Sequence, residues 1–254
     1  MELYLQWKAL MQNGVDIPFW QDIYVKFYQA FIEANRWQKY LEGVGPTLLV
    51  TAIALAIGIL LGVLVAVIRS AHDQQRPGNR NPLLGFANGL CKIYVTVIRG
   101  TPMLVQLLIM GFVIMKSCRN HTAVGALALG INSGAYVAEI IRGGLMALDP
   151  GQAEAGRSLG LSYMDTMRFI IIPQAFKAIL PSLSNEFITL LKDTALIYTI
   201  GGKELVYAAQ AIATKTYEQM FPLMGSALIY LILVMLFTWL QTKLERRLQE
   251  SDRR

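Results

Sequence analysis

The chain contains a run of 25 residues without one charged side chain, from Val44 to Ile68. In a helix that rises ~1.5 Å per residue, about 20 apolar residues cross the ~30 Å hydrocarbon core of a bilayer. A second uncharged run, 24 residues long, extends from Gln219 to Thr242. Runs of this length predict membrane-spanning helices, so the sequence predicts an all-α membrane protein.

The composition excludes most soluble classes of protein. Only 16% of the 254 residues are charged and 54% are hydrophobic, whereas an ordinary soluble domain is about 25% charged. The cysteines, Cys91 and Cys118, are too few for a disulfide scaffold, and neither His72 nor His121 has a neighbour at metal-ligand spacing. We therefore expect a multi-pass membrane protein without a metal site.

Three further spans are expected between the two long runs. The uncharged runs Thr101–Met115 and Thr122–Ala138 contain 15 and 17 residues, and each becomes a full span if its helix extends past a charged residue. The fourth span, which carries Glu186, Lys192 and Asp193, has weak hydropathy. The five expected spans are residues 44–68, 94–116, 122–142, 182–202 and 219–242.

Lysine and arginine are distributed unevenly between the two sides of these spans, which predicts the orientation. Fourteen lie on the side that receives residues 69–99, 142–181 and the tail, and eight lie on the other side. The richer side is therefore expected to be cytoplasmic, with the N-terminus outside and the C-terminus inside.

This orientation divides the chain into three regions. Residues 1–43 form an extracytoplasmic extension, whose aromatic residues recur at helical spacing after Pro18. That spacing favours an amphipathic helix, either on the membrane surface or packed against the first span. Residues 44–245 form the transmembrane domain, and residues 246–254 form a basic cytoplasmic tail that suits a membrane anchor better than a nucleic-acid site.

The cytoplasmic loop 149–181 between the third and fourth spans is too patterned to be a linker. Residues 152–159 predict a short helix that stops at Gly160, because glycine suits the position after a helix. Ser162 is expected to cap a second helix that ends before Pro173. Such a helical hairpin could bind a soluble partner.

The amino-acid sequence of this loop resembles a known family pattern. Glu154-Ala155-Gly156 is followed after three residues by Gly160 and after nine more by Ile170-Ile171-Ile172-Pro173. This resembles the EAA loop of ABC importer permeases, with glycine for the second alanine and isoleucine for leucine. The resemblance covers about residues 41–248, and further stretches are similar to the polar amino-acid branch: Arg99–Pro102, Asn132–Tyr136, Arg142–Gly144 and Asn185–Thr194.

The resemblance implies a permease with five membrane helices that binds a cytoplasmic ABC ATPase dimer. Its ATPase-coupling positions would be Glu154, Ala155, Gly156, Gly160 and Pro173. The chain has no Gly-x4-Gly-Lys-Ser/Thr loop, so ATP and Mg are expected in the ATPase, with no cofactor and no catalytic residue here. The alternative to a coupling role is that Glu154 and Gly160 only cap and end a solvated hairpin.

The other implied partners are an extracellular or periplasmic amino-acid-binding protein, a second permease copy or paralogue, and the lipid of the bacterial plasma membrane. Nucleic acid is not expected as a partner.

Polar side chains within the third and fourth spans form the candidate substrate site. Polar groups inside the bilayer core are energetically unfavourable, so their presence there indicates a function. An α-amino acid needs amide or hydroxyl donors for its carboxylate and a carboxylate for its ammonium group. In the permeases that this chain resembles, the corresponding Asn-Glu pair lines a mid-membrane amino-acid site. In the alternative, the acidic side chains serve only helix–helix pairing. The candidate residues are Asn132, Ser133, Asn185, Glu186 and Asp193.

Three other patterns predict structure only. Small residues at every fourth position from Ala54 to Ala66 predict a close helix-packing face. Glu139 and Arg142, three residues apart, predict an ion pair near the cytoplasmic end of the third span. Thr101 is expected to cap a helix that begins at Pro102.

The sequence therefore predicts the permease of an ATP-driven importer for polar amino acids. An ion-coupled secondary amino-acid transporter is the alternative, although such folds usually show internal repeats and none is visible here. An intramembrane enzyme is disfavoured because no nucleophile and base occur in a suitable pattern.

Overall fold

A computed structural model of the chain describes residues 1–75 and 81–252. Helices are the only regular structure in these residues, which confirms the predicted all-α class. Four arginines that contributed to the predicted orientation lie outside the described residues: Arg76, Arg80, Arg253 and Arg254.

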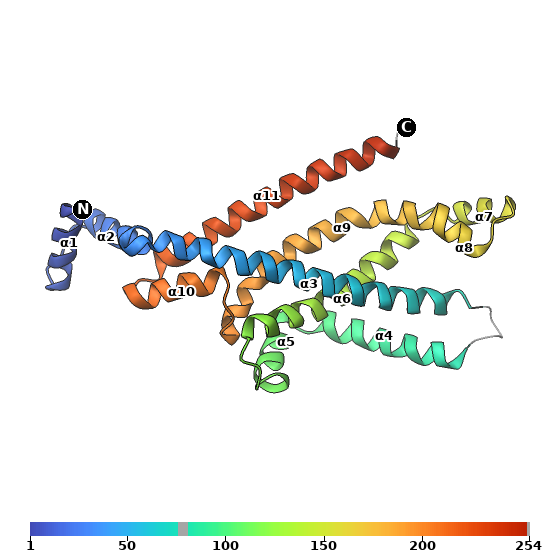
Figure 1. Ribbon diagram of the computed structural model, residues 1–254, viewed down its shortest axis with the longest axis horizontal. Coiled ribbons are helices and arrows are strands. Elements are labelled where there is room, and N and C mark those ends of the chain that lie inside the picture. Colours follow the sequence, from blue (N-terminus) through green and yellow to red (C-terminus); the bar gives the residue numbers. More distant parts are fainter. Residues whose placement is uncertain (76–80, 253–254) are drawn as a thin grey trace.

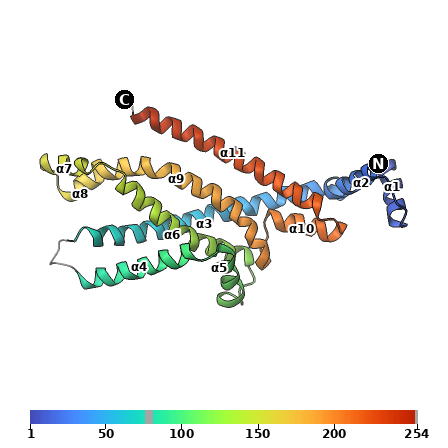
Figure 2. The same cartoon turned by 180° about the vertical axis from the view of Figure 1, so that it is seen from behind.

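The helices form an elongated bundle (Figures 1 and 2). In both views, α1 and α2 lie at one end, whereas α7, α8 and the last residues of α3 lie at the other. The α-helices are α1 (Glu2–Gln12), α2 (Phe19–Phe31), α3 (Arg36–Asp73), α4 (Pro82–Gly100), α5 (Met103–Ile109), α6 (His121–Met146), α7 (Pro150–Ser158), α8 (Tyr163–Thr166), α9 (Ile172–Asp193), α10 (Leu205–Thr216) and α11 (Met220–Asp252). The 3-10 and π segments are η1 (Glu33–Asn35), η2 (Met110–Ile114), η3 (Met167–Ile171) and η4 (Thr194–Ile200).

Three helical segments of the described residues are long and apolar enough to cross a membrane: Glu33–Asp73, His121–Met146 and Met220–Leu248. A fourth candidate is the pair Pro82–Gly100 and Met103–Ile114, which is bent by 108°. Helix α9, which covers much of the fourth predicted span, is not among these candidates. The count of five spans and the sidedness of the termini therefore stay predictions.

The bend between α4 and α5 is made by two extended residues, Thr101 and Pro102. Proline disfavours helical geometry in the residue before it, so α4 cannot continue through Thr101. The prediction that Thr101 caps α5 is wrong by one residue, because Pro102 occupies the N-cap position. The Thr101 hydroxyl instead donates to the Val97 carbonyl at 2.8 Å, at the end of α4.

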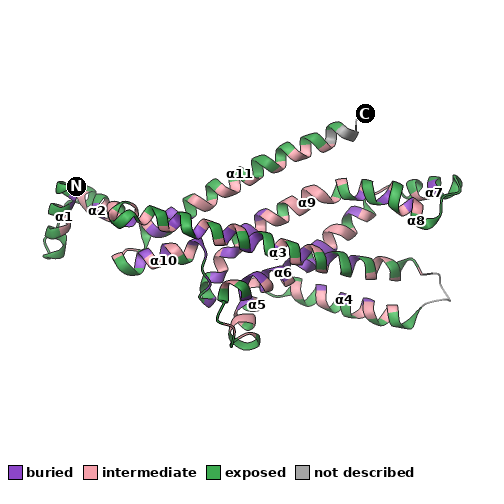
Figure 3. Ribbon diagram, viewed as in Figure 1, coloured by how far each residue is buried: buried purple, intermediate pink, exposed green. Residues whose placement is uncertain are grey.

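The core of the bundle lies where α3 crosses α6 (Figure 3). The predicted stripe of small residues lies at this crossing. A Cβ atom added to Gly58 would lie 2.7 Å from Ser133 Oγ, and one added to Gly62 would lie 2.5 Å from Val137 Cγ1. The two backbones approach so closely only because these positions lack side chains, which confirms the stripe as a packing face.

Aromatic contacts attach the N-terminal helices to the bundle. Tyr4 of α1 stacks on Tyr28 of α2 with ring centroids 4.1 Å apart. Phe31 stacks on Tyr40 of α3 at 5.5 Å. The aromatic helix therefore packs against the helix of the first predicted span, which is one of its two expected placements. Lys8 donates a hydrogen bond to Glu33, and this bond raises the pKa of Lys8 above its ordinary value.

Replacing Gly62 with alanine is expected to lower the thermal unfolding temperature of the purified protein. The new methyl group would overlap Val137, and overpacking of this kind costs about 1–3 kcal/mol. Gly45→Ala is the matched control, because it adds the same methyl group to the same helix where no atom lies within 4 Å. Equal unfolding temperatures for the two variants would contradict the close α3–α6 contact.

Candidate functional site

The middle of α6 is joined to α9 by a hydrogen bond between side chains. Ser133, the thirteenth of the 26 residues of α6, is fully buried. Its Oγ donates to Oε1 of Glu186 in α9 at 2.7 Å. A carboxylate among apolar helices is strongly disfavoured unless a donor satisfies it, so this bond stabilises the position of Glu186.

Asn132 belongs to a different polar contact from its neighbour Ser133. Its Nδ2 donates to Oε1 of Gln106 in α5 at 2.9 Å. The Gln106 amide in turn donates to the Ile98 carbonyl and to Thr101 Oγ1, each at 2.7 Å. Adjacent residues of a helix point about 100° apart, so Asn132 meets the α4–α5 bend while Ser133 meets α9.

The other two predicted site residues, Asn185 and Asp193, take no part in the hydrogen bond between Ser133 and Glu186. Asn185 is exposed, and its position next to Glu186 gives its side chain another direction on α9. Asp193 is half-buried at the last residue of α9, where the chain turns into η4. Within the described residues, no hydrogen bond joins either side chain to this pair.

Two residues of the site were missed by sequence reasoning. Gly58 of α3 leaves the space that Ser133 Oγ occupies, although the stripe around it predicted only packing. Gln106 fixes Asn132, and its signal was a lone amide in the uncharged run Thr101–Met115. Neither partnership can be found without the crossing geometry of the helices.

The first part of the hairpin in the loop 149–181 forms as its local sequence predicts. The Asp149 side chain accepts from the Gly151 amide at 2.8 Å and caps α7. The helix ends at Ser158, and Gly160 has a φ of +79°, which confirms the predicted stop. The predicted cap of the second helix is also confirmed, because Ser162 Oγ accepts from the Asp165 amide at 3.1 Å.

The prediction that the second helix ends before Pro173 is wrong. Helix α8 passes through the π segment Met167–Ile171 directly into α9, so the chain is helical from Tyr163 to Asp193. Pro173 lies in the first turn of α9. The missing N–H of a proline costs little there, because the wider π turn has already shifted the hydrogen-bond pattern.

The five predicted coupling residues differ in their surroundings. Glu154, Ala155, Gly160 and Pro173 are exposed, whereas Gly156 is buried against α8. A Cβ atom at Gly156 would lie 2.7 Å from Thr166 Cγ2 and 2.8 Å from Thr166 Oγ1. The glycine that departs from the EAA pattern is therefore matched to a threonine in this chain.

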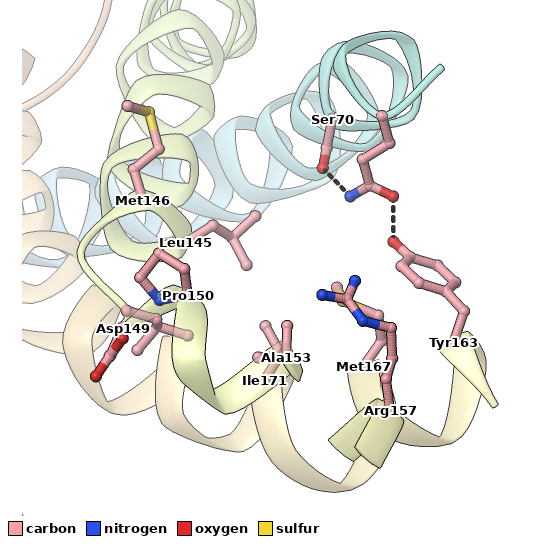
Figure 4. A pocket seen from close by; sticks show the side chains of 12 residues that line it. Ser70, Leu145, Met146, Asp149, Pro150, Ala153, Arg157, Tyr163, Met167 and Ile171 are labelled. Atoms are coloured by element: carbon pink, nitrogen blue, oxygen red, sulfur yellow. Dashed lines mark hydrogen bonds between the residues drawn. The ribbon is translucent and has the colours of Figure 1, made fainter. Parts of the chain in front are cut away.

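A cavity of about 630 Å³ separates the hairpin from the ends of α3 and α6 (Figure 4). The Arg157 side chain projects into it from α7. A polar bridge crosses one edge, where the Tyr163 hydroxyl donates to Gln74 Oε1 at 2.5 Å and Gln74 Nε2 donates to Ser70 Oγ at 3.3 Å. The hairpin is thus continuous with α9 but touches α3 here through polar contacts.

Residues 83–250 match the family described as the binding-protein-dependent transport system inner membrane component. The chain belongs to this family. It is therefore a permease component of an ABC importer, and its relatives are transport proteins rather than enzymes.

Three relatives illustrate the similarity. The arginine transport system permease protein ArtQ of Bacillus subtilis (strain 168) is 37% identical over 185 residues, which cover 67% of this chain and 84% of that protein. The putative glutamine transport system permease protein GlnP of Rickettsia felis is 37% identical over 228 residues, covering 88% and 96%. The glutamine transport system permease protein GlnP of Escherichia coli (strain K12) is 34% identical over 168 residues, covering 65% and 77%.

Solved structures show the same fold. An amino acid ABC transporter crystallised with histidines superposes with a TM-score of 0.75 and 39% identity, covering 85% of this chain and 96% of that one. An inward-facing structure of the MetNI methionine ABC transporter has a TM-score of 0.68 at 19% identity, covering 83% and 96%. The second comparison supports the fold alone.

The Gly156–Thr166 contact predicts a compensating pair of substitutions. Gly156→Ala alone should lower the unfolding temperature, because its Cβ would overlap both γ atoms of Thr166. Combining it with Thr166→Ala removes those atoms and should restore much of the lost stability. Thermal unfolding of the two single variants and the double variant measures the coupling. Simple additivity of the two effects would show that the hairpin does not pack in this way.

Proposed function

We propose that this chain is the membrane-spanning permease subunit of an ATP-driven importer for polar amino acids in the bacterial plasma membrane. The hydrogen bond between Ser133 and Glu186 at the middle of α6 carries the proposal, because it places an acidic side chain inside the bundle. The family and the arginine and glutamine permeases among the relatives support it.

Glu186 would bind the ammonium group or a cationic side chain of the substrate. Ser133 occupies one carboxylate oxygen, Oε1, and no described residue donates a hydrogen bond to the other. An oxygen available in this way suits a cationic ligand. The amides of Asn132 and Asn185 would serve the substrate carboxylate, with one N–H of Asn132 already donated to Gln106. Asp193 would add negative charge about two turns further along α9.

The cytoplasmic hairpin would couple the permease to its ATPase dimer. Glu154 and Ala155 present an exposed face on α7, next to the turn that Gly160 makes. Motion of the hairpin would pass through η3 into α9 without a break in the helix. It would thereby move Glu186 relative to Ser133 and expose the site to alternate sides of the membrane.

The remaining parts of the transporter would be supplied by other chains. ATP and Mg would bind to the ATPase, and an extracytoplasmic binding protein would deliver the substrate. A second copy of this chain, or a close paralogue, would complete the pathway.

Glu186→Gln is expected to lower arginine uptake by about tenfold, because a hydrogen bond to a charged group contributes about 1.5–3 kcal/mol. Glutamine uptake should fall less, since its side chain carries no charge. The measurement is uptake of each labelled amino acid by the complete transporter in vesicles containing ATP.

Two hydroxyl variants test the position of that carboxylate. Ser133→Ala removes the donor to Glu186 and should also reduce uptake, whereas Ser184→Ala removes an α9 hydroxyl that donates only to the Leu180 carbonyl. Unchanged arginine uptake in Glu186→Gln would refute the proposed site. Uptake that needs an ion gradient but no ATP would favour an ion-coupled transporter.

Substitutions at Gly160 test the coupling role. At a φ of +79° alanine is strained by about 1–2 kcal/mol, whereas asparagine tolerates this conformation better. No atom lies within 4 Å of the added Cβ, so the strain comes from the backbone alone. Gly160→Ala should therefore retain less ATPase in co-purification than Gly160→Asn. Glu154→Lys should reduce retention without backbone strain, and full retention in all three variants would contradict coupling through α7.

A further inference from the structure

A second polar cavity lies between α3, α4 and α6, apart from the Ser133–Glu186 pair. Its volume is about 360 Å³. Three of its lining side chains are basic and one is acidic, so its charge is positive. The lining residues are Arg69, Lys92, Val95, Thr96, Arg99 and Glu139.

Glu139 is the centre of an ion-pair cluster around this cavity. Its Oε1 accepts from Arg69, and its Oε2 accepts from Arg142 at 3.1 Å and lies 3.8 Å from Arg99 Nη1. The predicted pair of Glu139 and Arg142 is thus confirmed, with two more arginines added to it. Lys92 is exposed and forms no ion pair with a described residue. One carboxylate cannot neutralise these four cations.

The excess cations have donors left for an anion. An arginine side chain carries five N–H donors in a planar fork, and the contacts with Glu139 engage only part of them. This fork matches the oxygens of a phosphate group. Glu139 also fixes the orientation of Arg69, so the donors are arranged before any ligand binds.

The surroundings of the cavity favour a lipid over a soluble anion. Residues 68 and 142 end the first and third predicted spans, so Arg69 and Arg142 lie at the depth expected for lipid phosphates. Lys92 lies just before the second predicted span, which begins at residue 94, so it is expected at the same boundary.

We propose that this cavity binds the phosphate of an anionic phospholipid of the inner leaflet. Basic pockets between membrane helices on the cytoplasmic side commonly hold such head groups. The proposal does not depend on which substrate the protein transports.

The test measures binding of cardiolipin to the purified transport complex by native mass spectrometry, with phosphatidylcholine as the neutral reference. Lys92→Gln removes a charge without breaking the Glu139 cluster, and it should weaken cardiolipin binding by about fivefold. Arg99→Gln should have a similar effect. Lys243→Gln is the control, because this cation lies over the Trp239 ring, 5.3 Å from its centroid, outside the cavity. Its variant should bind cardiolipin like the unmodified protein.

The other outcomes overturn the proposal. Equal binding of cardiolipin and phosphatidylcholine, or equal weakening in Lys243→Gln, would show that lipid binding is not specific to the cavity. Unchanged cardiolipin binding in both cavity variants would show that another surface holds the lipid. Inorganic phosphate is titrated in a separate arm, and its binding at the cavity with displacement of cardiolipin would identify a soluble-anion site instead.

Discussion

The hydrogen bond from Ser133 to Glu186 depends on a glycine in a third helix. A carboxylate in the middle of an apolar bundle must receive a donor, and the donor must itself lie inside the bundle. Ser133 meets this requirement because Gly58 lets α3 approach α6 until no room for a Cβ atom remains. The packing stripe and the polar site therefore depend on the same close contact between α3 and α6, which positions the Ser133 hydroxyl towards α9.

The hairpin and the site are connected by continuous helix. The chain is helical from Tyr163 to Asp193, so a force on the hairpin displaces Glu186 along with it. The hairpin faces α3 across a cavity that the Tyr163–Gln74 bond crosses at one edge. Polar bonds can exchange with water when the parts separate, whereas a continuous helix transmits the displacement. The expected motion is thus of α9 relative to α3 and α6.

Local chemistry explains which features could be predicted from the sequence. The long uncharged runs, the Ser162 cap and the Gly160 stop each depend on a few adjacent residues, and the all-α class follows from the first of them. The contacts of Asn132 and Glu139 with other helices depend on helix rotation and on the 108° bend, which spacing along one chain does not encode. The role of Pro173 was missed because a π turn relieves the usual penalty.

Glu139 of α6 and Glu186 of α9 differ in a way that favours Glu186 for the proposed substrate site. Glu139 faces three arginines, so its charge is compensated within the protein and a ligand cation would have to displace one of them. Glu186 receives a single neutral hydroxyl from the described residues, which orients the carboxyl group without adding a counter-ion. A cationic substrate gains most where the protein supplies a fixed charge without its own counter-ion. The same reasoning separates the two polar regions, with cations in excess around Glu139 and a carboxyl group without a counter-ion at Glu186.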